Sequence, residues 1–213
     1  MTKDGHIYLI DDDASMRKSL TRMLRDLGYL VEDYSSAVDF FEKSVPVAPA
    51  VILLDMQMPD MTGLELQEKL IKLGRKTPIV FVSGQSHPHQ IVQSLKKGAL
   101  DFLFKPFNLE ELLKAVADAI EFDGRQLKRV SLNVETRREY ESLTPREREV
   151  FGWLVEGLLN KDIAVKLGTT DATIKVHKAR VMSKMNADSV QMLVKKFLES
   201  DLSNHPLNTW LKG

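Results

Sequence analysis

The chain has no cysteine among its 213 residues. Disulfide bonds and thiolate metal sites are therefore excluded. It also has no apolar run that approaches the roughly 18 residues that a membrane-spanning helix needs. Its first residues, MTKDGH, lead into a short apolar run and then three acids, a pattern that does not fit a signal peptide. These absences predict a cytoplasmic protein with no membrane partner.

Charge is balanced over the whole chain but not along it. Residues 1–122 carry 14 Lys and Arg against 18 Asp and Glu, whereas residues 123–213 carry 16 against 12. A mildly acidic half followed by a mildly basic half suggests two tasks, the second at nucleic acid. Chance alone also gives differences of this size, so the asymmetry supports the interpretation without deciding it.

Short apolar runs alternate with amphipathic stretches over the first 122 residues. The runs are rich in Val, Ile, Leu and Phe and predict strands at 6–10, 30–34, 50–54, 78–82 and 101–104. The stretches between and after them predict helices at 14–27, 36–44, 63–73, 88–97 and 108–121. This order predicts an α/β fold with a doubly wound, five-stranded parallel sheet. Such a sheet binds its ligands outside the carboxyl ends of its strands.

Acidic residues and one lysine follow the predicted strands. Asp11 and Asp12 come after the first strand, Asp55 after the third, Ser83 after the fourth and Lys105 after the fifth. A carboxylate at the end of a buried strand is costly unless a site uses it. Carboxylates suit Mg²⁺, and a lysine can neutralise a phosphoryl group. Taken singly, Asp13 could be a helix cap, Asp60 a turn residue and Lys105 part of a surface ion pair. The joint placement of Asp12, Asp55 and Lys105 at strand ends favours a site.

The segments IDDD, LLDMQMPDMTG, VSG and FKPF resemble the receiver domain of two-component response regulators, over residues 5–122. The resemblance implies a flavodoxin-like fold and a sensor histidine kinase that phosphorylates Asp55. It implies that Ser83 and Lys105 contact the phosphoryl group and that Phe102 is an aromatic switch. It also implies a cis peptide before Pro106 and a Mg²⁺ cofactor, whose ligands would be Asp11, Asp12, Asp55 and the backbone carbonyl of Gln57.

A Mg-dependent phosphatase of the haloacid dehalogenase type is the alternative. Asp11 and Asp13 form the D-x-D pair that such enzymes use after their first strand. That family continues toward Gly-Thr and has a further acidic pair after its fourth strand. Here Ala14 follows the pair, Ser83 follows the fourth strand, and Asp55 would have no role. Asp13 also fits a helix N-cap.

The segment after residue 122 is polar and charged, and Gly124 interrupts its helical pattern. We predict a partly helical linker at 123–138, with a weak apolar stripe formed by Leu127, Val130 and Val134. Thr144, Pro145 and Glu147 form a capping box with Pro at the first helical position. A small all-α domain of four helices is predicted at 139–203, before a tail at 204–213, with helices at 145–156, 161–167, 171–185 and 188–199.

The stretch from Leu143 to Leu198 resembles the LuxR-type helix-turn-helix of the NarL/FixJ response regulators, closest to the FixJ-like branch. A recognition helix at 171–185 fits the major groove of double-stranded promoter DNA. The resemblance implies that Lys175 and Val176 contact bases. Phosphate contacts are implied for Lys178, Arg180 and Lys184, and further DNA-facing candidates are Lys161, Thr173 and His177. A solvated helix face is the alternative for each lysine, and packing is the alternative for His177.

These features predict a response regulator that phosphorylates only its own Asp55 and is otherwise not an enzyme. The resemblance implies a homodimer when phosphorylated, and RNA polymerase as a partner in activated transcription. A constitutive DNA-binding protein with an inactive receiver is a third hypothesis. The complete set Asp11, Asp12, Asp55, Ser83 and Lys105 argues against it.

Overall fold

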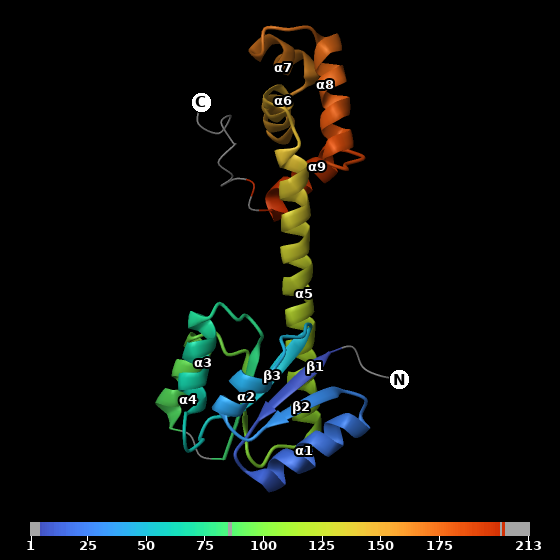
Figure 1. Cartoon of the computed structure of the whole chain (residues 1–213). Helices are drawn as coiled ribbons and strands as arrows, with labels where there is room; N and C mark the ends of the chain where they lie inside the picture. The colour runs from blue at the N-terminus through green and yellow to red at the C-terminus, as the bar shows by residue number, and fades with distance from the viewer. Residues whose placement is uncertain (1–4, 85–86, 201, 203–213) are drawn as a thin grey trace. The chain divides into compact units, whose positions relative to one another are not determined.

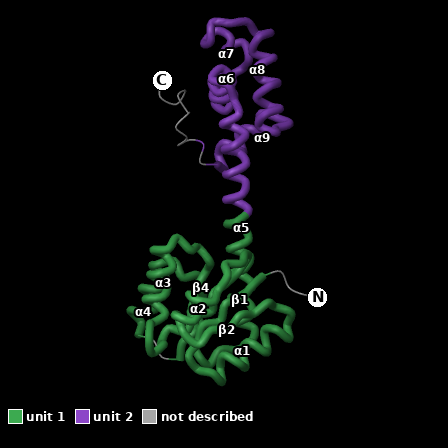
Figure 2. Tube along the Cα trace, in the orientation of Figure 1, with its two compact units in different colours: residues 1–127 green, residues 128–213 purple. Residues whose placement is uncertain are grey.

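A computed structural model describes residues 5–84, 87–200 and 202. The chain divides into two compact units, residues 1–127 and 128–213 (Figure 2). Within the described residues, no helix combines the length and apolar character that a membrane crossing requires.

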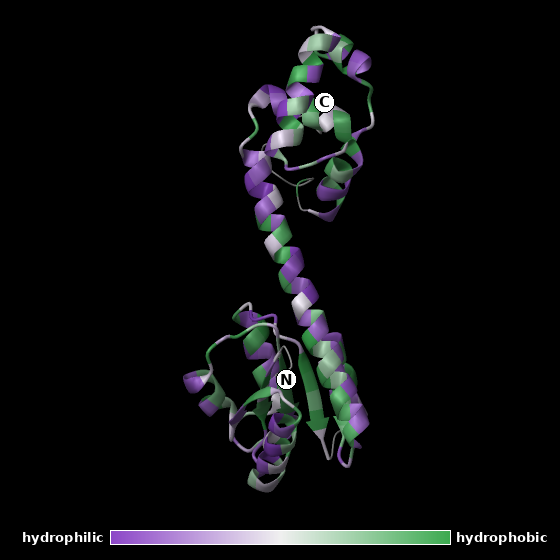
Figure 3. Cartoon of the chain, turned by 90° about the vertical axis from the view of Figure 1, so that its right-hand side faces the viewer, coloured by the Kyte–Doolittle hydropathy of each residue, from purple (hydrophilic) through white to green (hydrophobic). Residues whose placement is uncertain are grey.

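The first unit is built on a five-stranded parallel sheet with the strand order β2-β1-β3-β4-β5 (Figure 1). The predicted doubly wound sheet is confirmed, with two strands ending one residue later than expected. Figure 3 shows the strands coloured as hydrophobic, as expected for parallel strands covered on both faces. The strands are β1 (His6–Ile10), β2 (Leu30–Tyr34), β3 (Ala50–Asp55), β4 (Ile79–Ser83) and β5 (Asp101–Phe104).

Helices cover both faces of this sheet. On one face, Leu24 and Val116 from α1 and α5 pack against β1 residues such as Ile7. On the other face, Phe40 and Leu66 from α2 and α3 join a second core cluster. Alternate residues of each strand therefore feed two cores. The helices are α1 (Ala14–Asp26), α2 (Ala37–Lys43), α3 (Gly63–Lys72), α4 (Pro88–Lys96) and α5 (Leu109–Glu141).

Helix α5 is longer than predicted, because it continues through the segment expected to be a linker. The expected break at Gly124 is wrong. A glycine costs only about 1 kcal/mol within a helix, and the residues that follow it here, Arg-Gln-Leu-Lys-Arg, are good helix formers. An i,i+4 ion pair between Glu121 and Arg125, at 2.9 Å, spans the glycine. The stripe formed by Leu127, Val130 and Val134 is exposed.

In its described residues, 128–200 and 202, the second unit combines the end of α5 with four shorter helices, so the predicted all-α region is confirmed. Thr144 and Glu147 form the expected capping box at the start of α6. Gly168 has a φ of +61° in the turn between α7 and α8, a conformation that favours glycine. The core includes Tyr140 of α5. The four helices are α6 (Pro145–Val155), α7 (Asn160–Lys166), α8 (Asp171–Lys184) and α9 (Val190–Glu199).

Candidate functional site

Three carboxylates meet at the carboxyl edge of the sheet. Asp11 follows β1 and Asp55 ends β3, and these two strands are paired neighbours. Ligand oxygens of Asp11, Asp12 and Asp55 all lie within 4.8 Å of one another. Asp11 and Asp55 are buried, whereas Asp12 is exposed. The sequence-predicted acids are therefore brought together, with one open side.

Lys105 joins the two buried acids. Its Nζ lies 2.8 Å from Oδ2 of Asp11 and 3.1 Å from Oδ2 of Asp55. Its backbone N–H donates to the carbonyl of Ser83 at 2.8 Å, which fixes the residue beside the end of β4. The peptide bond between Lys105 and Pro106 is cis, as the resemblance implied.

Burial and hydrogen bonding act in opposite directions on these groups. Burial raises the pKa of Asp55 above its ordinary value, although the Gln57 N–H and Lys105 partly oppose the shift. Burial alone would lower the pKa of Lys105, but hydrogen bonds to Asp11 and Asp55 outweigh it and raise the pKa. The lysine is therefore held as a cation between two acids.

The donor set fits a hard divalent cation. Three carboxylates against one ammonium leave an excess of two negative charges, which a bound Mg²⁺ would offset. The exposed position of Asp12 leaves room for the waters that Mg²⁺ retains. The Gln57 N–H donates to Oδ1 of Asp55 at 3.2 Å, so the Gln57 backbone lies beside the acidic group. Coordination by the Gln57 carbonyl stays a prediction.

Ser83 and Phe102 lie on β4 and β5, respectively. Ser83 is the last residue of β4 and is buried. Phe102 is half-buried and stacks on Phe81, with ring centroids 6.2 Å apart, and it also contacts Phe104 at 4.9 Å. The roles of Ser83 as a phosphoryl contact and of Phe102 as a switch stay predictions.

Asp13 has a structural role. One of its oxygens accepts hydrogen bonds from the N–H groups of Ser15 and Met16, at 2.8 and 3.1 Å, and so caps α1. These bonds hold the pKa of Asp13 below its ordinary value. The N-cap interpretation is confirmed, which removes one acid from the D-x-D pair of the phosphatase alternative.

Arg17 is a site residue that the sequence did not reveal. Its Nη1 donates to the carbonyl of Asp11 at 2.6 Å, and it lies 3.4 Å from that of Asp12. The side chain thus braces the loop that presents both acids. An arginine one turn into a helix has no distinctive sequence signal, so only the folded loop shows this contact.

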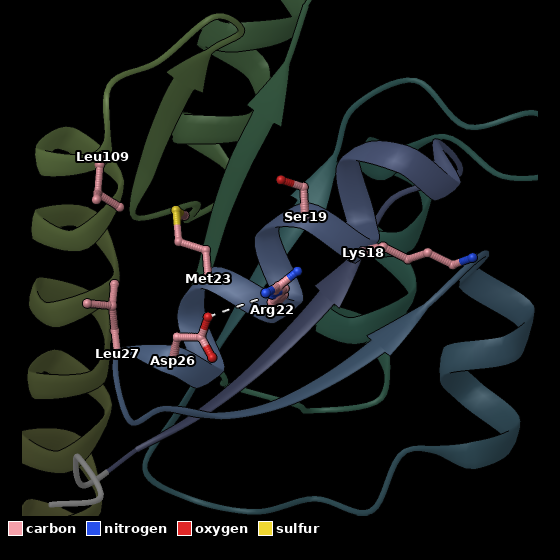
Figure 4. Close-up of a pocket in the computed structure, with 7 residues that line it drawn as sticks. All are labelled: Lys18, Ser19, Arg22, Met23, Asp26, Leu27 and Leu109. Atoms are coloured by element: carbon pink, nitrogen blue, oxygen red, sulfur yellow. Dashed lines mark ion pairs between the residues drawn. The ribbon is translucent and has the colours of Figure 1, made fainter.

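A separate shallow hollow lies between α1 and the start of α5 (Figure 4). None of the acidic-site residues lines it, so it is a distinct surface. Figure 4 marks the ion pair between Arg22 and Asp26, at 3.9 Å, along its rim. Its lining mixes charged, polar and apolar side chains: Lys18, Ser19, Arg22, Met23, Asp26, Leu27 and Leu109.

Helix α8 presents most of the predicted DNA-facing residues. Thr170 caps it by accepting the Thr173 N–H at 3.2 Å. The Nζ of Lys175 lies 2.8 Å from Oδ2 of Asp171, and this hydrogen bond raises the pKa of Lys175. The exposed members of the predicted set are Lys161, Thr173, Lys175, Val176, Arg180 and Lys184, and the half-buried ones are His177 and Lys178.

Two of these residues have surroundings that differ from the rest. Lys184 places its Nζ 2.7 Å from Oε2 of Glu147 and 3.1 Å from the carbonyl of Ser142. Glu147 is only 2% exposed, so this ammonium has a structural partner already. The buried Nδ1 of His177 has no hydrogen-bond partner among the described residues, which is consistent with the packing alternative. DNA contacts by both residues stay predictions.

Comparisons with known proteins match both units. Residues 7–117 match the family model described as the response regulator receiver domain, and residues 141–197 match the bacterial regulatory proteins of the luxR family. The chain is similar to the response regulator protein TmoT of Ectopseudomonas mendocina, with 39% identity over 91% of this chain and 88% of that protein. It is also similar to the transcriptional regulatory protein FixJ of Bradyrhizobium diazoefficiens, with 34% identity over 96% of this chain and 100% of that protein.

Solved structures agree with this assignment. The response regulator StyR superposes with a TM-score of 0.79 at 34% identity, covering 92% of this chain and 100% of that one. The D-x-D phosphatase alternative is not supported, because every line of comparison leads to response regulators and Asp13 is a cap. The receiver implies a sensor kinase as partner, and the helix-turn-helix implies DNA binding. With a receiver domain and a LuxR-type DNA-binding domain in one chain, the protein belongs to the NarL/FixJ family of two-component response regulators.

Proposed function

We propose that Asp55 accepts a phosphoryl group from a phosphohistidine of a sensor kinase, and that this step controls DNA binding. The observation that carries the proposal is the bridge from Lys105 to Asp11 and Asp55, beside the exposed Asp12. A half-buried lysine between two buried acids, with an open side and excess negative charge, suits a site for a cation and a phosphoryl group.

The chemistry needs few groups. An oxygen of Asp55 attacks phosphorus, the new O–P bond forms, and the N–P bond breaks with its electron pair remaining on the histidine ring. The ammonium of Lys105 lies within hydrogen-bond reach of Asp55, where it can stabilise the charge of the transferred oxygens. Asp11, Asp12, Asp55 and the Gln57 carbonyl would hold Mg²⁺, which supplies further positive charge when bound. The chain thus catalyses transfer to itself only.

The output follows from the added charge. A phosphoryl group adds a charge close to −2 at the carboxyl edge of the sheet. In this proposal Ser83 moves toward the phosphoryl oxygens, and Phe102 turns into the space left behind. The change is a bias between two states, and it favours a homodimer.

The second domain carries the DNA contacts in this proposal. Lys175 and Val176 contact bases, whereas Lys161, Lys178 and Arg180 contact phosphates. Lys184 serves mainly as a structural anchor, because Glu147 already holds its ammonium. The dimer places two recognition helices on half-sites about one helical turn apart and works with RNA polymerase to activate transcription. The proposed domains are residues 5–122 and 139–203, in a cytoplasmic protein.

Labelled acetyl phosphate tests the first step. Incubation with the full-length chain and Mg²⁺ should give an acid-labile label that Asp55→Asn and chelation of the cation both abolish. Asp60→Asn is the matched control, because Asp60 is an exposed acid in the loop after β3. Label retained in Asp55→Asn would overturn the assignment of Asp55.

A further inference from the structure

Helix α5 contains a buried carboxylate that the acidic site does not use. Asp123 is only 7% exposed, and its Oδ2 accepts a hydrogen bond from the backbone N–H of Ala50 at 2.8 Å. Burial raises the pKa of Asp123, and the Ala50 N–H opposes that shift only in part. A buried carboxylate costs free energy, so this single, directional bond calls for an explanation.

The bond joins α5 to the strand that carries the phosphoacceptor. Ala50 is the first residue of β3 and Asp55 is the last. All six residues of β3 are buried, and the strand is paired on both sides, to β1 and β4. The preceding residue, Pro49, accepts a hydrogen bond from the His6 N–H at 3.0 Å. Asp123 therefore binds a well-fixed point at the opposite end of the strand from Asp55.

Asp123 is also the last side chain of α5 that the receiver buries. Just before it, Ile120 packs closely on Gly5. A Cβ added at Gly5 would lie only 2.6 Å from Cγ2 of Ile120. Just after it, residues 125–132 are all exposed. The same helix ends in the core of the second unit, through Tyr140. Any change in the receiver that shifts α5 would therefore reach the exposed stretch of the helix at Asp123.

We propose that Asp123 is a positioning residue that couples phosphorylation of Asp55 to DNA binding, by fastening α5 to the start of β3. This inference rests on the proposed function and names the link between its two parts. A purely structural role for Asp123 would change stability or both DNA affinities together. A coupling role changes the ratio of the affinities with and without the phosphoryl group.

The test uses the full-length chain and a duplex that the phosphorylated protein selects from a random pool. The dissociation constant is measured before and after treatment with acetyl phosphate and Mg²⁺. We expect Asp123→Ala to reduce the ratio of the two constants about tenfold. Asp123→Asn, whose side-chain oxygen can accept the same N–H, should keep the ratio. Asp118→Ala is the matched control, since Asp118 is exposed on the same helix.

The amount of label on Asp55 should be equal in all variants. An unchanged ratio of the two dissociation constants in Asp123→Ala would overturn the inference. Loss of the ratio in Asp123→Asn as well would overturn the role of this hydrogen bond. Should Asp123→Ala not fold, Asp123→Ser replaces it, because its hydroxyl is too short to reach Ala50. Absence of label in the unsubstituted chain would instead overturn the proposed function, and this inference with it.

Discussion

The two units bury charged side chains in different ways. In the first unit, Lys105 bridges the buried Asp11 and Asp55, and the exposed Asp12 lies beside them without a lysine partner among the described residues. In the second unit, the buried Glu147 and the half-buried Glu139 each pair with one lysine. Glu139 lies 2.8 Å from Lys196, and that lysine also donates to the Met185 carbonyl.

The comparison teaches that buried charge alone does not mark a chemical site. A neutral pair whose remaining hydrogen bonds go to backbone carbonyls has nothing left to offer a ligand. A cluster with excess negative charge, open on one side, is destabilising until a cation joins it. Excess charge and access therefore separate the acidic site from the anchors Glu139–Lys196 and Glu147–Lys184.

The largest effect should come from removing the shared lysine. Lys105→Ala should slow labelling of Asp55 by acetyl phosphate about 100-fold, because a charge-stabilising donor is lost. The matched control is Lys97→Ala, whose ion pair with Glu68 lies on the surface of the same unit. Rates are measured from the time course of label under excess phosphodonor. A normal rate in Lys105→Ala would show that the bridging geometry has no part in the transfer.

Removing the Lys184–Glu147 ion pair should lower the stability of the second unit without changing the phosphorylation of Asp55. Lys184→Ala leaves Glu147 buried without its ion pair, and we expect a loss of about 2 kcal/mol, between the values for exposed and buried pairs. Lys195→Ala is the control, since its pair with Glu199, at 3.9 Å, is exposed. Denaturant unfolding of the second unit, followed by circular dichroism, measures both. Equal stabilities for the two variants would contradict the anchor role.

The same pair gives a pH dependence. Burial alone would raise the pKa of Glu147, but hydrogen bonds from Lys184 and Thr144 outweigh it and lower the pKa below the ordinary value of 4.5. The ionised form is therefore favoured by folding, so its contribution is present above that value and is lost as pH falls below it. The stability difference between the unsubstituted chain and Glu147→Gln should shrink in acid. A difference that is constant from neutral pH into acid would refute this contribution.

The smallest effect should appear on the exposed face of α8. Lys175→Ala should weaken binding to the selected duplex about tenfold and relax base preference. Arg180→Ala should instead weaken binding to all sequences alike and reduce the salt dependence, as expected for a phosphate contact. Binding to selected and random duplexes is compared across salt concentrations. Equal losses of affinity for the selected and random duplexes in both variants would contradict the distinction between a base contact and a phosphate contact.

Much of the acidic site could be predicted from the sequence because parallel strands bring their carboxyl ends to one edge. Asp11, Asp12, Asp55 and Lys105 lie at or just after the carboxyl ends of β1, β3 and β5, so the topology brings them to the same edge of the sheet. The sheet and helices α6 to α9 could be predicted from apolar periodicity and capping residues. These patterns are local, and the fold combines them without altering them.

Other features depend on partners far away in sequence and carry no local signal. The bond from Asp123 joins residues 73 positions apart, and the anchor from Lys184 to Glu147 joins residues 37 apart. A lysine on a recognition helix looks the same in the sequence whether it contacts DNA or a buried glutamate. At Gly124 the local sequence predicted a break in the helix that does not occur. The flanking helix-forming residues outweigh the cost of the glycine.

The most direct test of control by the receiver is the affinity of the full-length chain for its selected duplex, with and without phosphorylation. We expect acetyl phosphate and Mg²⁺ to tighten binding by the unsubstituted chain and to leave Asp55→Asn unchanged. Equal affinities in both states of the unsubstituted chain, with label on Asp55 verified, would contradict the claim that the acidic site controls DNA binding.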